Sequence, residues 1–169
     1  MNSSLESNRV DSVMTRVLFT VRPTEKIAGV AQSFEEHDVH AAPVVNEDQV
    51  CIGVITSHDL VEYESSRSEL SQYLDHGETF DMAHYGDSRS VPVLRVPIDE
   101  VGVQMTTQFE SASPDMSLAD AARLMCQRHL HHLVILDQGR HPIGMVSALD
   151  ILGFLTDTPV VRQGPASAE

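Results

Sequence analysis

The chain has 169 residues, of which 25 are acidic and 11 are lysine or arginine, so its formal net charge at pH 7 is −14. This charge argues against nucleic acid or an anionic membrane as a partner, because both would be repelled. The length suits one compact domain or two small packed halves, not a regulatory module joined to a typical catalytic domain. Lys26 is the only lysine, which excludes a Walker-type phosphate loop.

The two ends of the chain, residues 1–9 and 156–169, are polar or rich in small residues, and we expect both to be flexible tails. The first of them has no apolar signal segment, and no apolar run reaches the roughly 20 residues of a membrane span. Cys51 and Cys126 are too few for a disulfide framework, and both lie among apolar residues. We therefore expect a soluble, cytoplasmic protein.

Residues 10–61 form the first structural unit. A short lead-in helix over 10–14 is followed by a strand around 17–21 that stops at Pro23. Two apolar runs, 42–45 and 50–55, predict a hairpin, and a second helix begins at Thr56. The first helix is predicted from apolar residues at helical spacing, namely Ile27, Val30, Ala31 and Phe34.

Residues 62–100 form an insert that is long for a connection inside a compact domain. Its first half is charged and rich in serine, and we interpret it as an extension of the preceding helix, followed by a loop. The insert is a candidate surface for reporting to a partner. Residues 99–105 are expected to form the lead-in helix of the next unit.

The second unit, 101–155, repeats the first, because residues 10–61 align with 101–152 without a gap at an offset of 91. The helical stripe recurs, with Ser117 as a candidate N-cap above Asp120. Each unit is predicted as strand, helix, strand, strand, helix, which gives an α+β fold. The duplicated helical positions are Leu118, Ala121, Ala122 and Met125.

One polar motif is repeated at the junction of strand and helix: Thr56 and Asp59 in the first unit, Ser147 and Asp150 in the second. At a helix N-terminus the hydroxyl can bind a phosphate oxygen and the carboxylate can accept both hydroxyls of a ribose. Gly53 and Gly144 precede the motifs and would allow a ligand to approach closely. The alternative is that these residues only cap their helices, and the duplication favours the nucleotide interpretation.

With these motifs the chain resembles a tandem cystathionine-β-synthase (CBS) domain pair, or Bateman module. The resemblance rests on the MT pairs, Pro23 and Pro114, HAAPVVN and HHLVILD, and GVITSHDL and GMVSALDI. It covers nearly everything except the tails and the insert. It implies two repeats packed about a pseudo-twofold axis, clefts that hold AMP, ADP, ATP, NAD or S-adenosylmethionine, and association into homodimers.

Carried over by position, the resemblance implies that each Thr or Ser holds phosphate and each Asp holds ribose. Val54 and Met145 would flank the base. Backbone bonds and stacking would come from residues near the first strand of each repeat and at the second strand, namely Val17, Phe19, Gln108, Phe109, Ala41 and His132.

The chain departs from some nucleotide-binding members, because His132 and Ala41 stand where those carry an arginine. The remaining cations near the clefts are histidines and Arg16, Arg128 and Arg140. A ligand with one phosphate, or a nucleoside such as S-adenosylmethionine, therefore fits better than ATP alone. Magnesium could supply missing charge.

The histidines His129, His131, His132 and His141 raise a metal hypothesis. Since His131 and His132 occupy successive strand positions, they should point to opposite faces and not share an ion. We therefore predict no metal site. The histidine cluster instead favours a cleft that responds to pH through protonation of His132. No arrangement of nucleophile and base suggests catalysis.

The sequence thus predicts a non-enzymatic regulatory module, which senses adenosine-type ligands, carries an adenine-nucleotide or energy signal and passes it to an unknown protein partner. Two alternatives remain open: a constitutive interaction module with empty clefts, and a histidine-based metal or pH sensor.

Overall fold

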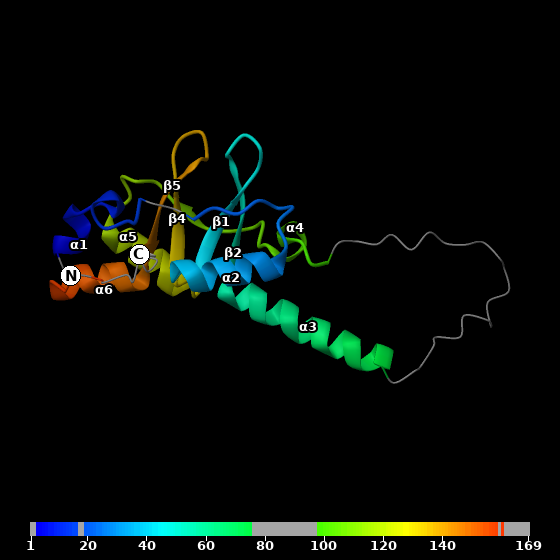
Figure 1. Cartoon of the computed structure of the whole chain (residues 1–169). Helices are drawn as coiled ribbons and strands as arrows, with labels where there is room; N and C mark the ends of the chain where they lie inside the picture. The colour runs from blue at the N-terminus through cyan, green and yellow to red at the C-terminus, as the bar shows by residue number, and fades with distance from the viewer. Residues whose placement is uncertain (1–2, 17–18, 76–97, 159, 161–169) are drawn as a thin grey trace, which may run out of the picture.

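A computed structural model describes residues 3–16, 19–75, 98–158 and 160. Two similar α+β units lie side by side, with the strands at the centre and the long helices against them (Figure 1). The expected fold class is confirmed. Beside the small elements named below, the first unit contains α2 (Ile27–His37), β1 (Ala41–Val45), β2 (Cys51–Thr56) and α3 (Ser57–Asp75), and the second contains α5 (Leu118–Arg128), β4 (His132–Leu136), β5 (Pro142–Ser147) and α6 (Ala148–Thr156).

Each unit is built on an antiparallel hairpin. Strand β1 pairs with β2, and β4 pairs with β5 in the equivalent register. A third strand, β3 (Ser111–Ala112), lies parallel to β4. In the first unit the equivalent position is a single parallel bridge between Val21 and Val44, and residues 17 and 18 of the expected strand lie outside the described residues.

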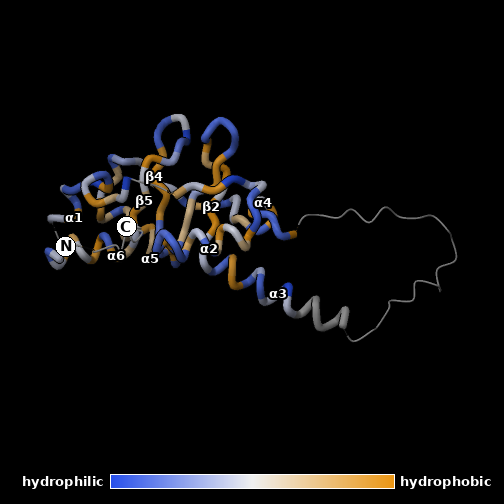
Figure 2. Tube along the Cα trace, viewed as in Figure 1, coloured by the Kyte–Doolittle hydropathy of each residue, from blue (hydrophilic) through white to orange (hydrophobic). Residues whose placement is uncertain are grey.

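Local backbone geometry repeats as well. Helices α2 and α5 both end in a left-handed residue, Asp38 (φ 51°) and His129 (φ 56°). Both hairpin turns contain another such residue, Gln49 (φ 61°) and Arg140 (φ 64°). The turns lie beside each other, since the Cys51 N–H donates to the Arg140 carbonyl (2.9 Å), and they are hydrophilic where the strands are apolar (Figures 1 and 2).

The predicted helical stripes pack as expected with one exception. Ile27, Val30 and Phe34 are buried, and so are their equivalents Leu118, Ala121 and Met125. Helical spacing predicts that Ala31 is buried, but Ala31 is exposed, whereas its equivalent Ala122 is partly buried. Whether a small side chain at the border of the stripe is buried depends on which elements pack beside it.

The lead-in segments are exchanged between the units. The first, with the 3-10 helix η1 (Val10–Ser12), docks on the second unit: the Val10 N–H donates to Met116 and the Leu118 N–H donates to Asn8. The second, with α4 (Val101–Gln104), docks on the first unit in the same way: the Val101 N–H donates to the Glu25 carbonyl and the Ile27 N–H donates to the Asp99 carbonyl. Accordingly, Val10 and Met14 belong to the core around α5, and Val101 belongs to the core around α2.

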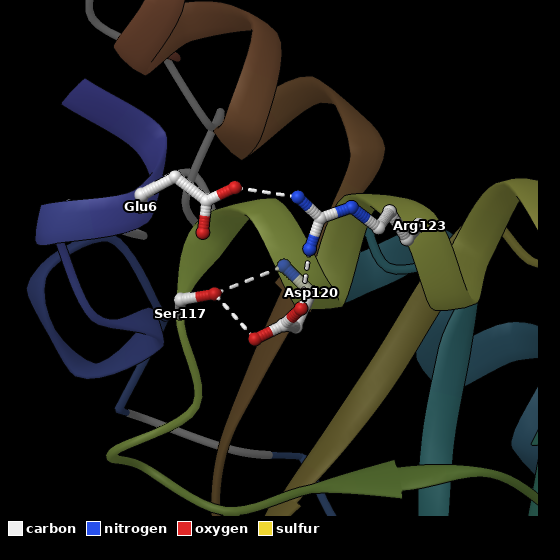
Figure 3. Close-up of polar contacts among 4 residues, drawn as sticks. All are labelled: Glu6, Ser117, Asp120 and Arg123. Atoms are coloured by element: carbon white, nitrogen blue, oxygen red, sulfur yellow. Dashed lines mark hydrogen bonds and ion pairs between the residues drawn. The ribbon is translucent and has the colours of Figure 1, made fainter. Parts of the chain in front are cut away.

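The first residues are not the flexible tail that we expected throughout. Residues Ser3–Ser7 form helix α1, which lies against α5. Leu5 packs on the second core, and Glu6 pairs with Arg123, which also pairs with Asp120 (Figure 3). These tertiary contacts order a segment whose own sequence carries no helical periodicity.

The insert begins as a continuation of α3, which extends away from the rest of the molecule as far as residue 75 (Figure 1). The loop expected in its second half lies at 76–97, outside the described residues. None of the helices in the described part of the chain has the length and apolar character needed to cross a bilayer.

Candidate ligand-binding cleft

Both repeated polar motifs form helix caps. In the first unit, the backbone N–H and the hydroxyl of Thr56 both donate to Oδ2 of Asp59, at 2.7 and 2.6 Å. In the second unit, the same two groups of Ser147 donate to Oδ2 of Asp150, each at 2.7 Å. Both motifs therefore have the geometry of a helix cap, which fixes hydroxyl and carboxylate together at each helix start.

The repeated glycines make room for the protein, not for a ligand. A Cβ on Gly53 would lie 2.7 Å from Sδ of Met105, and a Cβ on Gly144 would lie 2.5 Å from Sδ of Met14. Each methionine comes from the lead-in segment of the other unit. Our expectation that these glycines admit a ligand is replaced by a packing role.

The lead-in segments also pair with the strands that carry the motifs. The Thr15 N–H donates to the Met145 carbonyl (2.8 Å), and the Met145 N–H donates back to Thr15 (3.0 Å). Val54 and Thr106 exchange the equivalent bonds at 3.0 and 2.9 Å. The backbones of Val54 and Met145, the positions implied to flank the base, are thus occupied by these pairs.

One cavity of about 450 Å³ opens between the two units. It brings together five of the predicted site residues, from both repeats, and three histidines, so we call it the histidine cavity. It is lined by Thr15, Phe19, Asp38, Val39, His40, Ala41, His131, His132, Met145, Ser147, Ala148, Leu149 and Val160.

A second cavity of about 510 Å³ adjoins it and contains the predicted Asp150. We call it the aspartate cavity; it is lined by Val13, Thr15, Asp150, Gly153, Phe154, Asp157, Thr158 and Val160. The two cavities share Thr15 and Val160. Ser147 lines the histidine cavity and Asp150 lines the aspartate cavity, and these two residues belong to the same helix cap. We therefore treat the two cavities as neighbouring compartments of one cleft, which we call the α6 cleft.

The other predicted site residues line neither of these two cavities. Val54 and Phe109 pack on a cluster between the hairpins that includes Met145, while Gln108 is exposed. Thr56 and Asp59 cap α3 as described above. Val17 lies outside the described residues.

The titratable residues that line the cleft are aspartates and histidines, and neither lysine nor arginine is among the lining residues of the two cavities. Two of the candidate arginines are used elsewhere. Arg16 donates to the Asp11 carbonyl (3.1 Å), and Arg128 forms an ion pair with Glu110 (3.0 Å). A highly charged anion would therefore find little compensation in the α6 cleft.

His131 and His132 both line the histidine cavity, although strand alternation predicted opposite faces. His131 lies just before β4, where the alternation does not yet apply. His141 instead contacts the Asp137 carboxylate at 3.0 Å, and the bonds from His141 hold the pKa of Asp137 below its usual value. Among the described residues, no three His, Cys, Asp or Glu side chains are grouped to hold a metal ion.

The cysteines behave differently from each other. Cys51 is buried in the cluster between the hairpins, and this burial raises the pKa of its thiol. Cys126 is exposed on α5, although the sequence suggested an apolar environment for both. Sequence reasoning also missed Thr15, His40 and Val160 as cleft residues. The offset of 91 pairs His40 with His131, which was the available signal for one of them.

The comparisons with known proteins agree with this architecture. A sequence profile of the CBS domain matches residues 10–66 and 98–157, so the chain belongs to the CBS domain family. CBS domain-containing protein YhcV of Bacillus subtilis is 30% identical over 142 residues, which cover 84% of this chain and 81% of YhcV.

Solved CBS domain pairs have the same fold. The CBS domain pair of protein MJ0100, in complex with 5'-methylthioadenosine and S-adenosyl-L-methionine, superposes with a TM-score of 0.67 at 18% identity, covering 89% of this chain and 97% of that one. CBSX2, a CBS-pair protein from Arabidopsis thaliana, in complex with AMP gives 0.67 at 21% identity, covering 89% and 98%.

Proposed function

We propose that this chain is a non-catalytic regulatory module that binds an adenosine-containing ligand in the α6 cleft and signals its presence to a protein partner. The observation that carries the proposal is the convergence of Phe19, Ala41, His132, Met145 and Ser147 on one cavity, with Asp150 in the adjoining compartment. The ligands bound by MJ0100 and CBSX2 support the class of ligand.

Within that class, the charges of the cleft favour a nucleoside or a nucleoside monophosphate. Two carboxylates, Asp38 at the end of α2 and Asp150 on α6, are among the lining residues. They attract a cationic group such as the sulfonium of S-adenosylmethionine and repel a triphosphate. We therefore expect S-adenosylmethionine to bind more tightly than ATP without magnesium.

Isothermal titration calorimetry of the chain and of three variants tests the proposal. Asp150→Ala should lose binding, and Asp59→Ala should retain it if the α6 cleft is the working site. Asp120→Ala is the matched control, because Asp120 makes the same kind of cap with Ser117 (2.7 Å) but lines neither cavity. Retained binding in Asp150→Ala, or no binding of any adenosine ligand by the chain, would contradict the proposal.

We further propose that the chain forms a homodimer through its exposed apolar helix faces. Leu149 and Leu152 on α6 are 64% and 53% exposed, and Val61, the equivalent of Leu152, is 64% exposed on α3. Leu149 and Leu152 are three residues apart and so lie on one face of α6, and such exposed apolar side chains favour burial against a second copy. Light scattering should show a dimer that Leu152→Glu converts to a monomer; a monomeric wild-type chain would refute this.

A further inference from the structure

The chain turns back over the α6 cleft directly after helix α6. Asp157 adopts a left-handed conformation (φ 52°), and the Thr158 N–H donates to the Gly153 carbonyl (2.9 Å). Val160 then reaches the cleft. We call Asp157, Thr158 and Val160 the C-terminal turn, and all three line the cleft.

The turn packs closely against one residue of α6. A Cβ on Gly153 would lie 2.7 Å from the Thr158 carbonyl oxygen and 2.8 Å from Cγ2 of Val160. A Cβ atom does not approach a backbone oxygen or another carbon this closely in folded proteins. The absence of a side chain at position 153 is therefore what allows the turn to lie against the helix.

Val160 lies where the two compartments meet, because it lines both of them. Ser147 faces the histidine cavity and Asp150 faces the aspartate cavity. A single adenosine ligand that contacts both residues must extend from one compartment into the other. The apolar Val160 side chain lies at that junction and offers no polar group to such a ligand.

We propose that the C-terminal turn is an intramolecular competitor of the ligand: Val160 closes the α6 cleft, and the turn must leave before an adenosine ligand can bind. This inference rests on the proposed function. The observed dissociation constant then equals the intrinsic constant divided by the fraction of molecules with the turn displaced. Removing the turn should therefore tighten binding.

Two changes remove the obstruction by different means. Gly153→Ala introduces the Cβ that collides with Thr158 and Val160 and so displaces the turn, whereas Val160→Gly removes only the side chain at the junction and keeps the bond from Thr158 to Gly153. Gly29→Ala is the matched control, since it makes the same exchange within helix α2 and its Cβ would meet nothing within 4 Å. Circular dichroism checks that each variant is folded.

Calorimetric titrations with S-adenosylmethionine and AMP measure the effect. Both altered chains should bind about fivefold more tightly than the wild-type chain, or better, which is the lower end of common coupling between sites. Gly29→Ala should bind like wild type. Adding S-adenosylmethionine to the wild-type chain should also speed hydrogen exchange at the Thr158 amide, because the bond to Gly153 is lost when the turn leaves.

The outcomes separate the two proposals. If the wild-type chain binds and both altered chains bind equally well or more weakly, the competitor role is wrong and the proposed function stands. If no chain binds an adenosine ligand, both are wrong. If only the altered chains bind, the competitor role is supported, and the proposed binding by the wild-type chain is wrong.

Discussion

At the scale of single residues, the repeated glycines have a role that follows from the exchange of lead-in segments. Gly144→Ala should destabilise the chain by about 1–3 kcal/mol, because the new Cβ would lie 2.5 Å from Sδ of Met14 and 3.1 Å from the Thr15 carbonyl oxygen. Chemical denaturation measures the change. Gly53→Ala should have the same effect through Met105.

Two further variants show whether packing is the cause. Gly29→Ala should stabilise the chain by about 0.5–1 kcal/mol, since it replaces an unobstructed helical glycine. Adding Met14→Ala to Gly144→Ala should cost less than the sum of the two single changes. Simple additivity would show that the methionine is not what the glycine accommodates.

The cap of α5 gives a pH dependence at residue scale. The hydrogen bond from Ser117 and the pair with Arg123 hold the pKa of Asp120 below its usual value of 3.8. A lowered pKa stabilises the folded chain above that usual value, and the contribution is lost as the pH falls through the lower, folded-state pKa. The advantage in melting temperature of wild type over Asp120→Asn should therefore shrink between pH 6 and pH 2.5; a constant difference would contradict this.

At the scale of elements, periodicity predicted α2, α5 and both hairpins because their apolar residues face one core. Periodicity could not predict α1, which has only five residues. This helix depends on the packing of Leu5 and on an ion pair with Arg123 of α5, which is far away in the sequence. Ala31 is the opposite case. Helical spacing predicts that it is buried, but no neighbouring element covers it, and it is exposed.

The docking of α1 can be measured through its ion pair with α5. Both partners are about half exposed, with Arg123 at 49% and Glu6 at 47%, so water should keep their coupling weak. A double-mutant cycle with Glu6→Gln and Arg123→Gln, analysed by thermal unfolding, should detect this weak coupling at low salt. The coupling should vanish near 1 M salt; a salt-independent value would indicate that the pair acts through packing.

At the scale of the whole molecule, the cleft shows what sequence can and cannot supply. The family resemblance placed Phe19, His132 and Ser147 at the ligand, and the structure brings them to one cavity. Thr15 and Val160 were missed, because their positions depend on how distant segments fold back, which neither repeat encodes locally.

The exchange of lead-in segments predicts that each core responds to a mutation in the other repeat's sequence. Val10→Ala should cost about 2 kcal/mol and speed hydrogen exchange first in α5 and β4, because Val10 is buried in that core. Val101→Ala should act first on α2. Both variants should keep one unfolding transition; a Val10→Ala effect centred on α2 would refute the exchange.

The exchanged segments also bear on how such a chain can arise and be divided. A lone unit would keep its own lead-in, but that segment fits the other unit's core and would leave its own core uncovered. Two lone copies could cover each other by trading segments, which is the arrangement of a swapped dimer. The tandem chain is therefore the covalent version of such a pair, and a cut between the two sequence repeats would separate each lead-in segment from the core that it covers.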